Sequence, residues 1–467
     1  MKLSKPSPKT QNLIGCGVLV LLIFVGIGGY IGWRVYSFFS EFSTRARVEI
    51  PDELSEPRVL KGAEFLSKNE IFKLNQGSYV ETVKKAAAAA DEKEKQRIIS
   101  GYSAKKVYNF DDLKICGGEI VAAGEFGVQV LDLNGGFKRG ILFEPTLTKI
   151  KMGWYQQDDY KPAADNLQIV DFDGDGKCEF FSHGTTEGVT AYGNDGNIIW
   201  KYGGEETADV FKERDIENEV YVTEAAAGDL DGDGTAEYIV GRSNDGIRAF
   251  DRNGNEKWFQ PEEFPSAAMQ VLDVDGDGRG ELLEIGSKTK IRDGLRGNVV
   301  AEPKGGYSDM LLFTEDKNKR KALQFCDIDG NKLVCADENG TKFIESEAPL
   351  SEVKAKTPVE LPKSTPIDFG NGVVAVPGEA FGRDTESVYK PKAVWVSLRK
   401  DKPKYLAVIA SFIGIPRANF YIYEPNGTLV YHELLPEDAE TIAAIPANQT
   451  DEIVIAGKDT IWKFTPR

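Results

Sequence analysis

Three copies of one acidic segment decide the fold: Asp171-Phe-Asp-Gly-Asp-Gly-Lys-Cys-Glu179, Asp229-Leu-Asp-Gly-Asp-Gly-Thr-Ala-Glu237 and Asp273-Val-Asp-Gly-Asp-Gly-Arg-Gly-Glu281. Each copy has carboxylates at positions 1, 3, 5 and 9, which repel one another unless a cation lies between them. The two glycines let the backbone turn tightly enough to direct these side chains inward. Oxygen ligands of this kind are typical of Ca²⁺ sites, so the sequence predicts about three structural Ca²⁺ ions.

Short apolar strands surround the acidic loops and recur along the chain. A hairpin that contains glycine follows each loop, as in residues 189–200 and 247–258. The hairpin glycines, at positions 135, 196, 254, 297, 340 and 427, are 61, 58, 43, 43 and 87 residues apart. Units of about 40–60 residues with four short strands are typical of propeller blades. The sequence therefore predicts an all-β fold, a β-propeller of about seven four-stranded blades, or eight if residues 351–390 form a degenerate blade instead of an insertion.

The last repeat is incomplete. The chain ends on two apolar segments, 452–457 and 460–464, that suit the inner strands of a blade. We expect an earlier strand, near Val107, to complete this blade.

An uncharged apolar segment at residues 13–33 precedes the repeats. As a helix it would span about 30 Å of hydrocarbon, and the lysines at positions 2, 5 and 9 favour a cytoplasmic N-terminus. We expect a cytoplasmic tail at 1–12, a transmembrane signal anchor at 13–33 and an extracytoplasmic remainder; the alternative is a cleaved signal peptide. We further expect a juxtamembrane stalk at 34–104 with a helix at about 79–99, followed by the propeller at 105–467.

Charge and cysteine content limit the possible partners. The chain has 467 residues and a formal net charge of −17. Nucleic acid is not expected as a partner, because phosphate binding needs a basic surface. Of the four cysteines outside residues 13–33, Cys326 and Cys335 fall on expected paired strands. They form either a disulfide or two buried thiols.

The acidic repeat also suggests a family. The pattern Asp-x-Asp-Gly-Asp-Gly-x-x-Glu between strands resembles the FG-GAP/VCBS repeats of integrin-type β-propellers. An EF-hand would instead need flanking helices and a glutamate at position 12, which is Ser182, Val240 and Glu284 in the three copies. The resemblance implies side-chain ligands at positions 1, 3, 5 and 9 and a backbone carbonyl ligand at position 7. The implied metal ligands are Asp171, Asp173, Asp175, Lys177, Glu179, Asp229, Asp231, Asp233, Thr235, Glu237, Asp273, Asp275, Asp277, Arg279 and Glu281.

Alternate turns of a four-stranded blade lie on the same face, so we expect the acidic loops and the glycine hairpins to share one face. The links between blades should then lie on the other. The link at 144–166 carries Trp154, Tyr155 and Tyr160. Aromatic residues on such loops suit a protein or carbohydrate ligand, and packing on neighbouring blades is the alternative.

Catalysis has little support in the sequence. The only histidines are His183 and His432, and no nucleophile motif or phosphate-binding loop is present, so we assign no catalytic residue and no organic cofactor. We expect a membrane-anchored, extracytoplasmic, Ca²⁺-binding β-propeller that recognises a protein or glycan, as in cell adhesion. The alternatives are an envelope-assembly scaffold and a carbohydrate-active enzyme, such as a polysaccharide lyase, that uses the propeller mouth.

Overall fold

The chain is described by a computed structural model. The described residues are 57–74, 85–86, 88–100, 110–124, 127–142, 146–152, 155–161, 167–184, 188–203, 222–243, 245–262, 268–286, 289–304, 310–329, 332–349, 367–368, 374–375, 388–412, 415–447 and 449–467. The chain divides into two compact units. Glu56–Glu352 with Glu386–Arg467 form the larger unit, and Met1–Ser55 with Val353–Thr385 form the smaller one. In the smaller unit the described elements are two short paired strands, β25 (Ile367–Asp368) and β26 (Val374–Ala375).

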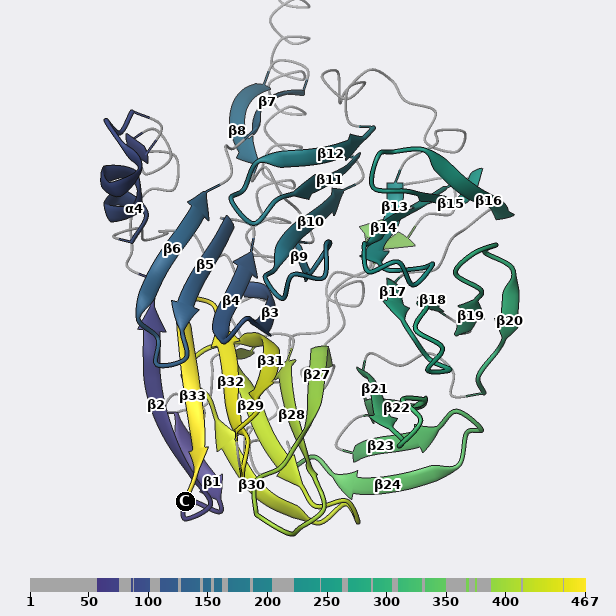
Figure 1. The fold of residues 1–467 in the computed structure, drawn as a ribbon. Helices are drawn as coiled ribbons and strands as arrows, with labels where there is room; N and C mark the ends of the chain where they lie inside the picture. The colour runs from purple at the N-terminus through teal and green to yellow at the C-terminus, as the bar shows by residue number, and fades with distance from the viewer. Residues whose placement is uncertain are drawn as a thin grey trace, which may run out of the picture. The chain divides into compact units, whose positions relative to one another are not determined.

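The larger unit is a seven-bladed β-propeller, as counted over its described residues (Figure 1). Each of the first five blades is a meander of four antiparallel strands that are consecutive in sequence, apart from the hairpin β7–β8 between blades 1 and 2. Blade 1 comprises β3 (Phe110–Cys116), β4 (Glu119–Gly124), β5 (Gly127–Asp132) and β6 (Phe137–Leu142). Blade 2 comprises β9 (Gln168–Val170), β10 (Glu179–Gly184), β11 (Gly188–Tyr192) and β12 (Ile198–Tyr202).

The next three blades follow the same order. Blade 3 comprises β13 (Val222–Gly228), β14 (Glu237–Arg242), β15 (Asp245–Phe250) and β16 (Glu256–Glu262). Blade 4 comprises β17 (Ala268–Leu272), β18 (Glu281–Ile285), β19 (Lys290–Arg292) and β20 (Val299–Ala301). Blade 5 comprises β21 (Met310–Glu315), β22 (Lys321–Asp329), β23 (Lys332–Asp337) and β24 (Lys342–Glu347). These five blades, together with the last two, confirm the prediction of about seven four-stranded blades.

The last two blades recruit strands from the N-terminal part of the chain. Blade 6 comprises β27 (Val388–Val396), β28 (Tyr405–Phe412), β29 (Ile415–Tyr423) and β30 (Leu429–Leu434), and β1 (Arg58–Lys61) pairs with β30 as a fifth strand. Blade 7 comprises β31 (Ala439–Ile445), β32 (Glu452–Gly457) and β33 (Thr460–Pro466), and β2 (Leu66–Lys73) pairs with β33 as its fourth strand. The expectation that a strand near Val107 closes the ring is wrong. The closing strand is β2, which lies within the range expected to form a stalk.

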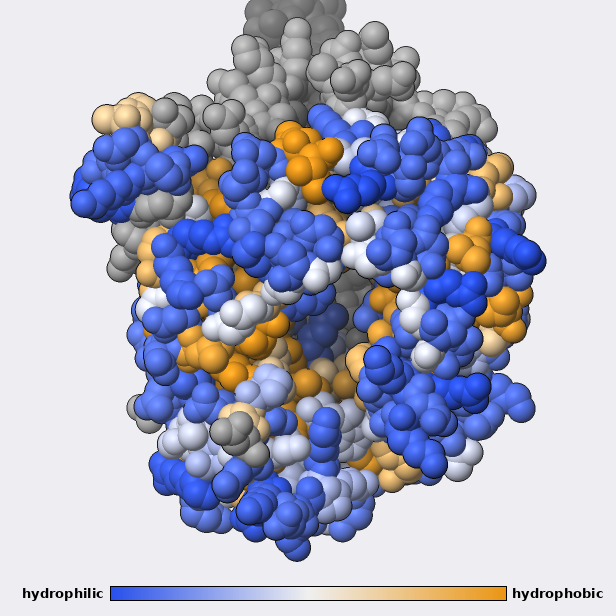
Figure 2. Space-filling view, in the orientation of Figure 1, coloured by the Kyte–Doolittle hydropathy of each residue, from blue (hydrophilic) through white to orange (hydrophobic). Residues whose placement is uncertain are grey.

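The core is divided among the interfaces between blades. The second and third strands of a blade are covered on both faces, which explains why sequences such as Ile453-Val-Ile-Ala456 are continuously apolar. Between blades 1 and 2, for example, Val121 and Val128 pack with Ile169 and Phe180, all at most 2% exposed. The face drawn in Figure 2 is largely hydrophilic, with hydrophobic residues visible between the blades.

Two further elements lie outside the blades. Helix α4 (Glu92–Ser100) begins after Asp91, whose Oδ1 accepts a hydrogen bond of 2.8 Å from the backbone N–H of Glu94. Residues 85–86 are also helical and residues 88–91 form turns and bends before α4, while the expected helix start near residue 79 lies outside the described residues. β7 (Thr146–Met152) and β8 (Tyr155–Lys161) form a separate hairpin in the link between blades 1 and 2. No helix in the described ranges is long and apolar enough to cross a membrane, and the apolar segment at 13–33 lies outside those ranges.

Two disulfides join described residues. Cys326 and Cys335 lie directly opposite each other on β22 and β23, with Cα atoms 4.1 Å apart, and both are fully buried. This resolves the two alternatives for this pair in favour of a disulfide. The second bridge, Cys116–Cys178, was not predicted from the sequence, and it joins blade 1 to the acidic loop of blade 2.

Candidate metal sites

The three acidic loops occupy equivalent places in consecutive blades. Each joins the first strand of its blade to the second, in blades 2, 3 and 4. In every loop the carboxylates at positions 1, 3 and 9 converge, with candidate ligand oxygens within 4.8 Å of one another. The groups are Asp171, Asp173 and Glu179; Asp229, Asp231 and Glu237; and Asp273, Asp275 and Glu281.

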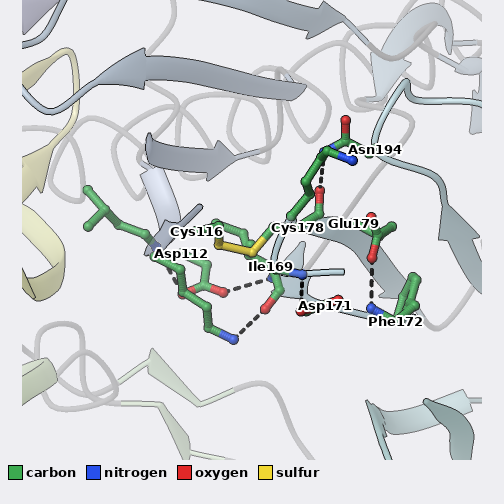
Figure 3. The surroundings of a disulfide bond; sticks show 12 residues. Asp112, Cys116, Ile169, Asp171, Phe172, Cys178, Glu179 and Asn194 are labelled. Atoms are coloured by element: carbon green, nitrogen blue, oxygen red, sulfur yellow. Dashed lines mark hydrogen bonds between the residues drawn. A yellow bond between two sulfur atoms is a disulfide. The ribbon is translucent and has the colours of Figure 1, made fainter. Parts of the chain in front are cut away.

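Backbone hydrogen bonds hold these carboxylates in position. In the first loop, Asp171 accepts hydrogen bonds from the N–H groups of Gly174 and Gly176, at 2.8 and 3.0 Å. Glu179 accepts one from the N–H of Phe172 at 2.7 Å (Figure 3). Both glycines have positive φ angles, +71° and +83°, which explains the residue type at positions 4 and 6.

The second and third loops repeat these bonds atom for atom. Position 1 accepts from positions 4 and 6, and position 9 accepts from position 2. Three unrelated stretches would not share one hydrogen-bond pattern by chance, so the shared sequence produces one local structure.

Position 5 lies differently from positions 1, 3 and 9. Asp175 accepts hydrogen bonds from the backbone N–H and the side-chain Nζ of Lys177, at 2.7 and 2.6 Å. Asp233 and Asp277 likewise accept from Thr235 and Arg279 at position 7. The converging groups therefore consist of three carboxylates each. The assignment of positions 5 and 7 as metal ligands stays a prediction.

Burial of the position 9 glutamates makes the converging groups electrostatically costly. Desolvation, followed by the negative charges of Asp173, Asp171 and Asp175, raises the pKa of Glu179 to about 7. Desolvation and the neighbouring aspartates also raise the pKa of Glu281. A cation with oxygen ligands would relieve both effects, since it restores favourable interactions to the charged carboxylates. The donor set therefore fits a hard cation such as Ca²⁺.

The second loop differs because it contains an internal cation. Lys257, on β16 of the same blade, bonds Asp231 with its Nζ, and bonds Glu237 at 3.0 Å. Burial raises the pKa of Glu237, and the hydrogen bond and charge of Lys257 oppose that shift. The role of this lysine was not predicted from the sequence, although Lys257 precedes Trp258 just as Ile199 precedes Trp200 in the matching repeat.

Adjacent loops are joined into a chain. The N–H of Ala236 in the second loop donates to the carbonyl of Phe172 in the first, at 2.7 Å. The N–H of Gly280 in the third loop donates to the carbonyl of Asp229 in the second, at 2.8 Å. On the other side of the first loop, the Cys116–Cys178 bridge connects it to the turn between β3 and β4 of blade 1 (Figure 3).

The acidic loop and the glycine hairpin of blade 2 share one face, as the sequence predicted. Asn194, in the hairpin between β11 and β12, donates from Nδ2 to the carbonyl of Cys178 at 2.8 Å (Figure 3). The links between blades leave from the opposite ends of the strands. In this blade, therefore, the acidic loop and the links are on opposite faces.

The other candidate residues are less well defined. Trp154 lies outside the described residues, while Tyr155 and Tyr160 are on β8. Their role in ligand binding stays a prediction. The two histidines are buried and bonded to neighbouring strands. His183 Nε2 lies 2.9 Å from Glu224 Oε1, and His432 Nε2 lies 2.8 Å from Asn419 Oδ1.

Comparison with known proteins adds little to this description. No protein-family model matches the chain, and no curated protein matches it significantly. Similar solved structures include the computationally designed Ika8 protein (12% identity, 78% of this chain and 97% of that chain, TM-score 0.40). A second is BBS1N in complex with ARL6DN (10% identity, 78% of this chain and 94% of that chain, TM-score 0.42). A third is the WD40 domain of Neurospora crassa Pan2 (11% identity, 76% of this chain and 88% of that chain, TM-score 0.39). These similarities are too low to carry an argument. The class of the protein, a seven-bladed β-propeller with three acidic loops, rests on its own strand pairing.

Proposed function

We propose that this protein is a Ca²⁺-stabilised propeller of the FG-GAP/VCBS kind, anchored in a membrane, that recognises a protein or carbohydrate outside the cytoplasm. The observation that carries the Ca²⁺ assignment is the threefold recurrence of one carboxylate geometry in equivalent turns. The likeness of the protein to FG-GAP/VCBS repeats rests on the sequence pattern of those turns.

The ions would have a structural role. Each acidic loop connects the first two strands of a blade, and the first and second loops each bond the acidic loop of the next blade, so an ion there would fix both the turn and the interface. No histidine, cysteine or nucleophilic serine belongs to the converging groups. We therefore assign the loops to stability and the recognition of ligands to another part of the propeller.

Location outside the cytoplasm has two supports. The first is the apolar segment at 13–33 with its preceding lysines, which suits a signal anchor. The second is the pair of disulfides, since such bridges persist mainly in oxidising compartments.

The proposed recognition surface is the link between blades 1 and 2. Sequence places Trp154 and Tyr155 at the turn of the β7–β8 hairpin, which lies outside the blade sheets and is not needed to complete them. Aromatic residues in connections between blades are frequent anchors for ligands.

A screen of the detergent-solubilised full chain on glycan and protein arrays tests this function. The screen is run with Ca²⁺ and again with a chelator. We expect a specific ligand that Trp154→Ala loses while the melting temperature is unchanged. A blank screen with folded, Ca²⁺-loaded protein would contradict ligand recognition and favour a scaffold role.

A further inference from the structure

All seven blades carry a β-bulge at the same place, between their third and fourth strands. At this register the fourth strand contributes one residue more than the third. In blades 1 to 7 the extra residues are Lys138, Ile199, Lys257, Val300, Phe343, Val430 and Ile71. Five of them are apolar and two are lysines.

Each of the two lysines bonds the glutamate that begins the second strand of its own blade. Lys138 Nζ lies 2.6 Å from Glu119 Oε1, and Lys257 Nζ lies 3.0 Å from Glu237 Oε1. Glu237 is the position 9 glutamate of the second acidic loop, and Glu119 occupies the same strand position in blade 1. Blade 1 has no acidic loop, because its turn reads Cys116-Gly-Gly-Glu119. A bulge lysine thus reaches this glutamate whether or not other carboxylates are present.

We propose that the bulge residue determines which acidic loops take a Ca²⁺ ion tightly. In the second loop the ammonium of Lys257 bonds carboxylates at positions 3 and 9, so it supplies the counter-charge that an ion would otherwise supply. In the first and third loops the bulge residues are Ile199 and Val300, which carry no charge. The inference rests on the proposed Ca²⁺ function and refines it to two tight sites and one weak site.

Among the described residues, three other cations bond residues of the first and third loops without bonding a converging carboxylate, and one of them, Lys321, donates to the backbone carbonyl of Asp273 at 2.7 Å. Lys177 and Arg279, in the first and third loops, bond the position 5 carboxylates and not the converging groups. Lys257 is also better enclosed, since its side chain is 23% exposed, compared with 64% for Lys177. A Ca²⁺ ion entering the second loop must therefore displace a partly buried ammonium. Loss of charge-assisted hydrogen bonds of this kind corresponds to binding weaker by about ten- to a hundredfold.

Calorimetric Ca²⁺ titration of the full chain, with native mass spectrometry to count ions, tests the proposal. The wild type should bind two ions tightly and a third about ten- to a hundredfold more weakly. Lys257→Ile should convert the weak site into a third tight site. In the reciprocal variants, Ile199→Lys and Val300→Lys should each leave one tight site. Lys201→Ile, which removes an exposed lysine from β12, controls for net charge and should behave as the wild type.

Melting in the presence of a chelator gives a second readout that does not depend on bound ions. There, Lys257→Ile should lower the melting temperature, because it leaves Asp231 and Glu237 without their counter-charge. Ile199→Lys should raise it. Three equal sites in the wild type that Lys257→Ile leaves unchanged would overturn this inference alone. Absence of Ca²⁺ binding in every variant would overturn the proposed Ca²⁺ function as well.

Discussion

The Cys116–Cys178 bridge should stabilise the protein more than the Cys326–Cys335 bridge. A disulfide stabilises mainly by restricting the unfolded chain, and the effect grows with the length of the closed loop. The two bridges close loops of 62 and 9 residues. The chain-entropy relation then gives about 4.3 kcal/mol for the first bridge and about 2.6 kcal/mol for the second at 25 °C.

The measurement must separate the bridges from the packing of their sulfur atoms. Cys326→Ala with Cys335→Ala leaves only the long bridge, and Cys116→Ala with Cys178→Ala leaves only the short one. For each double variant, the free energy of unfolding is measured by denaturant titration before and after reduction. The difference between oxidised and reduced forms cancels the cost of the alanine substitutions. A short bridge that contributes as much as the long one would refute the reasoning.

The long bridge should also affect Ca²⁺ binding, because Cys178 immediately precedes Glu179. Reduction of this bridge should weaken Ca²⁺ binding at the first acidic loop and leave Ca²⁺ binding at the third loop unchanged. An equal loss at both loops would show a general loss of structure instead of a local effect.

Three further predictions concern the metal loops, the ligand and pH. Chelation should lower the melting temperature, since an ion at a hundred times its Kd adds about 2.7 kcal/mol per occupied loop, and an unchanged melting temperature would refute the Ca²⁺ assignment. Trp154→Ala should weaken ligand binding at least about tenfold without changing the melting temperature. An unchanged affinity would show that the link between blades 1 and 2 is not part of the ligand site. Burial lowers the pKa of His432 to about 4 from 6.5, so the unfolded chain takes up a proton first as pH falls. The free energy of unfolding should therefore decrease by about 3 kcal/mol between pH 6.5 and pH 4. Denaturant titrations at these two pH values should show a smaller decrease for His432→Gln than for the wild type.

The acidic loops could be predicted because everything that forms them is local. Within nine residues the sequence supplies the carboxylates, the two glycines and the backbone groups that position them. The blade repeat was visible for the same reason, since each hairpin carries its own glycine. The Cys116–Cys178 bridge was not predictable, because it joins different blades and the residues around each cysteine carry no sign of its partner.

The closing strand was missed for a related reason. β2 reads Leu66-Ser-Lys-Asn-Glu-Ile-Phe-Lys73, a mostly polar outer strand that does not stand out from a solvated stalk. Its partner, β33, is about as distant as the chain allows, since Ser67 bonds Thr465 across a separation of 398 residues. Lys257 was visible in the sequence, but its role depends on a bulge register that only the strand pairing shows.

The use of β2 to complete the last blade determines when the protein can fold. During synthesis, β2 emerges early and has no partner until β33 leaves the ribosome, nearly 400 residues later. Closing a loop of that length costs about 5 kcal/mol beyond a constant term. The ring should therefore close as a late and slow step of folding. A nascent chain stopped before residue 460 lacks β33, so β2 and the edge of β32 would both be open to neighbouring chains.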